Sequence, residues 1–230
     1  MKSLLNYSAL FFLFLMISCK PGELGFSNKK RLLKNNYLVG NSIALEDLKD
    51  TTFVNLKSFS PDFSFDMKYA SKDNFLKKAV YDCPECYLRY KTVKQLIDAN
   101  KEFQKAGLTI KIFDCYRPMY IQKKMWKLFP NADYVADPNK GSIHNRGCAI
   151  DITLIDKDGK ELDMGTPFDF FGPEASHKYQ DLSEEVKKNR SYLKEVMIKN
   201  GFRSFESEWW HYNLINGYQE KLANFTWECK

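Results

Sequence analysis

The chain has 230 residues, of which 44% are hydrophobic and 15% aromatic, a composition typical of a globular protein rather than a disordered one. This length can bury a full core as one domain, or at most two small ones. The net charge of +6 is modest, and no basic stripe alternates with aromatic residues, so we expect no nucleic-acid partner.

Residues 1–19 are predicted to be an export signal. Lys2 precedes an apolar run that is too short and too weakly flanked for a membrane span. The run ends in "LMISC", which resembles a bacterial lipobox, although Met16 replaces the usual leucine. The resemblance implies cleavage and acylation at Cys19, and hence a membrane-anchored periplasmic lipoprotein of a Gram-negative bacterium. An ordinary signal peptide or an uncleaved anchor is the alternative.

Residues 20–60 are irregularly patterned and are predicted to form a spacer before a folded domain over residues 61–230. The spacer contains the basic cluster "NKKRLLKNN" at residues 28–36. We interpret this cluster as a solvated linker, and contact with anionic lipids is the alternative.

The first helix of the domain is predicted to start near Thr92, which forms a capping box with Gln95, and to end at Gly107. Residues 108–114 alternate between apolar and polar positions as a strand does. Pro118 then suits the first turn of the next helix.

A long loop over residues 129–143 leads to "CAIDITLI" (148–155), whose β-branched residues predict a strand. The segment at 156–161 is a turn signal. A second long helix is predicted over 183–200, and a final strand over 208–214. Strands and helices mix without regular βαβ alternation, which favours a single α+β domain with a central, mainly antiparallel sheet flanked by helices.

Export would place five further cysteines in an oxidising compartment, where structural disulfides are expected. The segment "CPEC" lacks the second Cys/His pair of a zinc knuckle and the surroundings of a thioredoxin motif. Five cysteines cannot all form disulfides with one another, and the sequence leaves the connectivity open. The cysteines are Cys83, Cys86, Cys115, Cys148 and Cys229.

The segment "GSIHNRGCAIDITL" (141–154) places His144 seven positions before Asp151. On a strand that starts at Gly147, Asp151 lies on a face of small and polar residues. A bend at Gly147 would bring the His144 imidazole over that face. Alone, this pair favours a structural hydrogen bond over half of a metal site.

The segment "ESEWWHY" supplies the rest of a possible metal site. A single-metal hydrolase needs three protein ligands, an open position and a carboxylate that accepts a proton. His144, Asp151 and His211 offer the ligands, and Glu208 offers the carboxylate. Taken alone, this segment would instead be a buried aromatic strand with a hydrogen-bonded histidine.

Two motifs then match one known family. The pattern S-x-H-x-x-G-x-A-x-D fits residues 142–151, and E-x-W-H fits residues 208–211. Three further segments resemble the family in the same order: "FDMKYASKDNF", "FDCYRP" and "MGTPFDFF". Across residues 63–214 the chain resembles the zinc D-alanyl-D-alanine dipeptidases of the VanX type.

The resemblance implies one Zn2+ per chain, bound at the sheet by His144, Asp151 and His211. It implies that Glu208 transfers the proton as general base and acid. It also implies that Arg117 stabilises the oxyanion of the tetrahedral intermediate, which suits a permanently charged guanidinium. Without the family, Arg117 would be interpreted as a surface arginine.

By resemblance Asp169 anchors the free ammonium group of the substrate, and Tyr69 and Ser142 lie near the substrate. A lysine or arginine of the protein could pair with Asp169 instead. The implied activity is hydrolysis of D-alanyl-D-alanine to two D-alanines, and export suggests scavenging of dipeptide from the cell wall. The alternatives are a zinc D,D-carboxypeptidase acting on peptidoglycan stem peptides and a non-catalytic zinc-stabilised binding lipoprotein.

Overall fold

The computed structural model describes residues 48–229 and contains a five-stranded sheet with the order β2-β4-β5-β7-β6 and a two-stranded sheet of β1 and β3. In the larger sheet the β2–β4 pair is parallel and the other three pairs are antiparallel. The strands are β1 (Phe53–Asn55), β2 (Ser64–Phe65), β3 (Tyr87–Arg89), β4 (Thr109–Asp114), β5 (Ala149–Ile155), β6 (Phe202–Phe205) and β7 (Glu208–Leu214).

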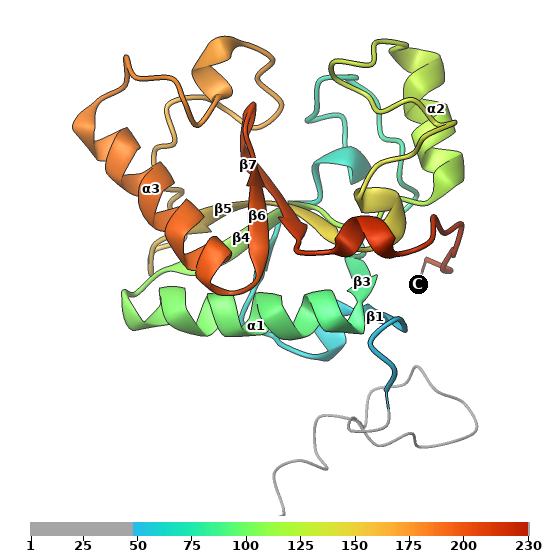
Figure 1. The fold of residues 1–230 in the computed structure, drawn as a ribbon, viewed down its shortest axis with the longest axis horizontal. Helices are drawn as coiled ribbons and strands as arrows, with labels where there is room; N and C mark the ends of the chain where they lie inside the picture. The colour runs from blue at the N-terminus through green and yellow to red at the C-terminus, as the bar shows by residue number, and fades with distance from the viewer. Residues whose placement is uncertain (1–47, 230) are drawn as a thin grey trace, which may run out of the picture. The chain divides into compact units, whose positions relative to one another are not determined.

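Three α-helices accompany the sheets in the described part of the chain. Figure 1 shows α1 running beneath β4 and β5, with α3 beside it and α2 on the other side of these strands. The helices are α1 (Tyr90–Lys105), α2 (Met119–Leu128) and α3 (Glu184–Lys199), and short 3-10 turns include η4 (His144–Arg146). The prediction of an α+β domain with a mainly antiparallel sheet is confirmed.

The middle of the larger sheet is the buried centre of the domain. Six of the seven residues of β5 are buried, because β4 and β7 pair with its two edges and α1 packs in the same core. Ile150 and Ile152 of β5 join a single core with Leu96 and Phe103 of α1. The apolar alternation in "CAIDITLI" therefore marks the side that packs in the core, and the polar positions between remain available for the site.

The predicted strands and the second long helix agree with β4, β5, β7 and α3. Ser183 caps α3, since its hydroxyl accepts a hydrogen bond from the Val186 amide at 3.2 Å. Gly201, at φ +83°, follows the end of this helix. Strand β6 was not predicted and forms a hairpin with β7.

The start of α1 differs from the prediction. Arg89 occupies the N-cap position without a side-chain cap. The Thr92 hydroxyl instead donates to the Gly147 carbonyl at 3.0 Å, so the predicted capping box is wrong. The hydroxyl that the capping box would use is engaged in this tertiary hydrogen bond instead. Pro118 similarly occupies the N-cap of α2 rather than its first turn.

The folded domain begins before residue 61, where the spacer was predicted to end. Residues 53–58 form β1 and a short 3-10 turn, and Val54 and Leu56 are buried in the core. Strand β1 pairs with β3 over only three residues, too few for a periodic pattern to appear in the sequence. The predicted signal, its Cys19 and the basic cluster 28–36 lie outside the described residues.

Two disulfides join cysteines of the described chain, Cys83 to Cys229 and Cys86 to Cys115. The prediction of structural disulfides is confirmed, and Cys148 is a buried free cysteine. The first bond ties the C-terminal tail to the loop before β3. Among residues 48–229, no helix has the length and apolar character needed to cross a membrane.

Candidate metal centre and active site

Two adjacent strands place two of the predicted ligands. Asp151 of β5 lies directly opposite His211 of β7 in the antiparallel register. His144 comes from η4, just before β5, and Gly147 ends this turn at φ +71°. A Cβ at Gly147 would lie 2.4 Å from Cε1 of Phe53, so both the positive φ and the close packing require glycine. The bend expected at Gly147 is therefore present.

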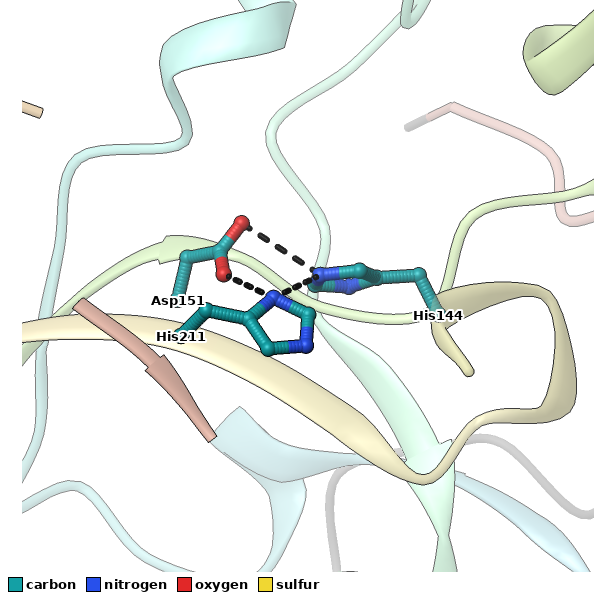
Figure 2. Close-up of side chains that lie close together, drawn as sticks. All are labelled: His144, Asp151 and His211. Carbon is teal, nitrogen blue, oxygen red and sulfur yellow. Dashed lines mark hydrogen bonds and ion pairs between the residues drawn. The ribbon is translucent and has the colours of Figure 1, made fainter. Parts of the chain in front are cut away.

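The three side chains converge on one point, as Figure 2 shows. Nε2 of His144 lies 3.2 Å from Nδ1 of His211 and 3.4 Å from Oδ2 of Asp151. Nδ1 of His211 lies 3.0 Å from Oδ1 of Asp151. Together these residues form a group whose ligand atoms all lie within 4.8 Å of one another.

The hydrogen bonds of the outer ring nitrogens indicate that the inner nitrogens of both imidazoles direct lone pairs toward the centre of the site. Nδ1 of His144 donates to the Cys115 carbonyl at 2.6 Å, and Nε2 of His211 donates to Oδ1 of Asn213 at 3.0 Å. In neutral imidazoles the inner nitrogens are then acceptors. Two nitrogen lone pairs and a carboxylate fit a zinc ion, and second ring nitrogens bonded to carbonyl oxygens are usual for zinc-bound histidines.

The electrostatics of the group also favour a cation. Burial alone would lower the pKa of His211, but its hydrogen bond to Asp151 and the charge there raise the pKa to about 9. Burial would raise the pKa of Asp151, but the adjacent imidazoles of His144 and His211 hold it below its ordinary value. The site thus stabilises positive charge at its centre.

Glu208 lies beside the ligand group without belonging to it. Its Oε2 is 3.8 Å from Nδ1 of His211, the nitrogen that faces Asp151. Burial raises the pKa of Glu208, and the nearby His211 partly opposes this effect. A partly buried carboxylate with a raised pKa, next to a metal-binding group, is suited to accept and return a proton.

Arg117 is buried, so the alternative of a surface arginine is wrong. Its Nη2 donates to Oδ2 of Asp114 at 2.7 Å and its Nη1 to Oε1 of Gln122 at 3.1 Å, while its buried Nε has no partner among the described residues. Burial would lower the pKa of Arg117, but Asp114 keeps it above the ordinary value. The guanidinium therefore remains charged and fixed.

Asp169 is linked to Arg117 through Tyr69. The Tyr69 hydroxyl donates to Oδ1 of Asp169 at 3.0 Å, and the guanidinium of Arg117 lies 5.3 Å from the centre of the Tyr69 ring. Oδ2 of Asp169 is buried without a hydrogen-bond partner in the described chain. Burial, and then the charge of Asp151, raise the pKa of Asp169 well above its ordinary value. One carboxylate oxygen is thus available for a cationic group from outside.

Ser142 and the two tryptophans complete the surroundings of the site. The Ser142 hydroxyl is buried and has no partner among residues 48–229, while its amide donates to Oδ1 of Asn145 at 2.7 Å. Trp209 and Trp210 are both buried, on opposite faces of β7. The indole of Trp209 donates to the Thr166 hydroxyl at 2.8 Å. The ring that packs against the His211 imidazole is Phe205, with the ring centroids 5.3 Å apart.

Several residues of the site were not predicted from the sequence. Asp114 accepts hydrogen bonds from Tyr81 and the amide of Cys115 as well as from Arg117. Asn213 orients His211, and it could have been found, since residues two apart on a strand share a face. No sequence pattern could have predicted the role of the Cys115 carbonyl, because every residue type has a backbone carbonyl.

Comparisons with known proteins find similarity to one family of dipeptidases. A family model described as peptidase M15, D-ala-D-ala dipeptidase, matches residues 49–228. The D-alanyl-D-alanine dipeptidase of Escherichia coli (strain K12) is 39% identical over 184 residues, which cover 79% of this chain and 95% of that protein. The D-alanyl-D-alanine dipeptidase of Enterococcus faecium is 32% identical over 171 residues, covering 65% and 85% respectively.

A solved structure of a mutant of the vancomycin-resistance D,D-pentapeptidase VanY, from a VanB-type cassette and in complex with Zn(II), also matches. It is 16% identical, covers 60% of this chain and 82% of that chain, and has a TM-score of 0.36.

Proposed function

The chain belongs to the peptidase M15 family of D-ala-D-ala dipeptidases, and on that premise we propose that it hydrolyses free D-alanyl-D-alanine to two D-alanines with a bound zinc ion. His144, Asp151 and His211 would hold the zinc. Their inner lone pairs, their closeness and the carbonyl partners of both imidazoles support this assignment.

One observation carries the choice of a free dipeptide as substrate. Oδ2 of Asp169 is buried and has no partner among the described residues. A buried carboxylate without a partner is costly, and the ammonium group of a free dipeptide would remove that cost. A stem peptide has an amide at this position instead of a charged ammonium, so it would leave the carboxylate unpaired.

When held by these three residues, zinc would supply Lewis-acid chemistry that activates water and polarises a carbonyl. Glu208 takes the proton from the attacking water and then delivers it to the departing amine. Arg117 donates hydrogen bonds to the oxygen that becomes negative during attack, using the Nε that is unpaired in the described chain. Because Asp114 and Gln122 hold the other two nitrogens, the guanidinium needs little reorganisation as the charge develops.

The assignment is tested with purified protein loaded with zinc. Release of D-alanine is measured from free D-Ala-D-Ala, from N-acetyl-D-Ala-D-Ala and from a stem pentapeptide. A clear preference for the free dipeptide is expected. Comparable rates on all three would favour a D,D-carboxypeptidase, and zinc binding without hydrolysis of any of them would favour a non-catalytic binding protein.

We further propose that the chain is exported, acylated at Cys19 and anchored to a membrane facing the periplasm. The lipobox-like "LMISC" supports this proposal. An enzyme in that position would scavenge dipeptide released from the cell wall. Labelling with a fatty-acid analogue in a bacterial host should mark the parent protein and leave Cys19→Ala unlabelled, and equal labelling would contradict acylation at this residue.

A further inference from the structure

The segment that joins β4 to α2 controls two functional groups although it lacks regular secondary structure. It runs over residues 115–118. The Cys115 carbonyl accepts the hydrogen bond from Nδ1 of His144, and Arg117 follows two residues later. No strand ladder fixes this carbonyl, so its position depends on other contacts.

Backbone hydrogen bonds hold the segment from the Cys115–Tyr116 peptide unit onward, and this planar unit carries both the Cys115 carbonyl and the Tyr116 amide. The Tyr116 amide donates to the Tyr87 carbonyl at 3.0 Å, and the Arg117 amide donates to the His144 carbonyl at 3.1 Å. The side-chain amide of Asn145 donates to the Arg117 carbonyl at 2.7 Å. At Cys115 itself, the amide bonds only to Oδ1 of Asp114, the preceding residue.

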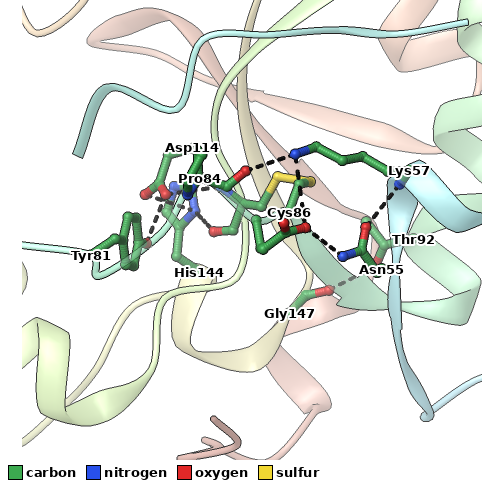
Figure 3. The surroundings of a disulfide bond; sticks show 11 residues. Asn55, Lys57, Tyr81, Pro84, Cys86, Thr92, Asp114, His144 and Gly147 are labelled. Carbon is green, nitrogen blue, oxygen red and sulfur yellow. Dashed lines mark hydrogen bonds and ion pairs between the residues drawn. A yellow bond between two sulfur atoms is a disulfide. The ribbon is translucent and has the colours of Figure 1, made fainter. Parts of the chain in front are cut away.

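Beside the bond from Tyr116 to Tyr87, a second tether at Cys115 is its disulfide to Cys86, shown with its surroundings in Figure 3. Both cysteines are fully buried. Cys86 directly precedes β3, and its carbonyl accepts the Leu56 amide at 2.9 Å, so it belongs to the rigid small sheet. The bond therefore connects the backbone that orients His144 to a fixed part of the core.

We propose that Cys86 and Cys115 are positioning residues for the metal site. Their disulfide, together with the hydrogen bond from the Tyr116 amide to Tyr87, holds the Cys115 carbonyl in place. The carbonyl fixes the tautomer and ring orientation of His144, which presents Nε2 to the metal. This inference rests on the metal site of the proposed function. The partners of zinc-bound histidines typically contribute about 10–100-fold to metal affinity. Loss of the disulfide leaves this carbonyl present but less firmly held, so it should weaken zinc binding by up to that factor.

The second disulfide provides the matched control. Cys83 and Cys229 join the same loop to the C-terminal tail, and neither residue contacts His144, Asp151 or His211 in the described hydrogen bonds and ion pairs. The test compares Cys86→Ala/Cys115→Ala with Cys83→Ala/Cys229→Ala in otherwise full chains. Zinc affinity is measured by competition with a chromophoric chelator, and ligand geometry from the visible absorption of the Co2+-substituted proteins.

The Cys86→Ala/Cys115→Ala protein should bind zinc more weakly, by up to about 10–100-fold, and show an altered Co2+ spectrum, whereas the control should match the parent in both. If the first variant does not fold, the control variant is treated with a phosphine in mild urea, which exposes the buried Cys86–Cys115 bond and converts it to two thiols and the phosphine oxide. Thiol counting confirms the reduction, and after removal of the urea the protein should show the same weakening. Parent-like zinc affinity and Co2+ spectrum after loss of this bond would overturn the inference. Hydrolysis by the parent is measured separately, so failure of the proposed function is distinguishable from failure here.

Discussion

Replacing Asp169 with asparagine tests how the enzyme selects a free dipeptide. Asparagine keeps the size of the side chain and can still accept the hydrogen bond that Oδ1 takes from Tyr69. What it removes is the negative charge on the buried Oδ2. Aspartate and asparagine are also the side chains best tolerated at positive φ, and residue 169 has φ +60°. The substitution thus changes charge with little strain.

The expected magnitude follows from this one lost interaction. A hydrogen bond to a charged group contributes about 1.5–3 kcal/mol, which corresponds to about 10–150-fold in kcat/KM. Asp169→Asn should lose this factor on free D-Ala-D-Ala. It should lose little on N-acetyl-D-Ala-D-Ala, which has no ammonium group. The preference for the free dipeptide, expressed as the ratio of kcat/KM between the free and the acetylated substrate, should therefore largely disappear.

The assay measures D-alanine release from both substrates with the parent and the variant, each at known zinc content. The control is the free energy of unfolding. Burial raises the pKa of Asp169 in the folded protein above its value in the unfolded chain. At a pH above the unfolded-state pKa, the ionised carboxylate therefore destabilises the folded state. Asp169→Asn should consequently unfold in urea no more easily than the parent at neutral pH. An equal loss of kcat/KM on both substrates, with zinc and stability intact, would refute the ammonium-anchor argument.

Three further predictions concern the metal and the proton. His144→Ala and His211→Ala should each lose zinc and activity, and near-stoichiometric zinc with normal turnover in either would contradict the ligand set. Glu208→Gln should keep zinc while kcat falls about 10²–10⁴-fold, whereas loss of the metal would make Glu208 a ligand. Burial raises the pKa of Glu208 in the metal-free protein, so its carboxyl should titrate above the usual glutamate range when zinc-free protein is followed by NMR, and added zinc should lower that pKa. Titration of the zinc-free protein within the usual range would contradict this environment.

Local sequence patterns predicted the parts of the fold that are long enough to show a period. The alternation in β5 placed Asp151 on the polar face, and the glycine before it correctly indicated a bend near His144. The pairing of Asp151 with His211 was not available from either segment, since register between distant strands depends on the whole sheet. Strands of two or three residues, such as β2, are too short for any pattern.

The capping-box error and the missed Asp114 have a common cause. Thr92 carries the residue type of a helix cap, yet its hydroxyl bonds to the carbonyl of Gly147, far away in the sequence. Asp114 is the polar last residue of an apolar strand, and its role appears only when Tyr81 and Arg117 are brought to it. Side-chain types set what a residue can bond, whereas the tertiary fold decides which partner it receives.

The two halves of the site differ in how the backbone holds them. Asp151 and His211 lie on paired strands, where the ladder fixes both at once. His144, Arg117 and Asp169 lie on a 3-10 turn or irregular backbone, the last at φ +60°. No strand ladder holds these three residues, so each depends on single contacts, namely the Cys115 carbonyl, the Asn145 side-chain amide and the Tyr69 hydroxyl. They should therefore be more sensitive than Asp151 and His211 to changes in residues that touch neither metal nor substrate.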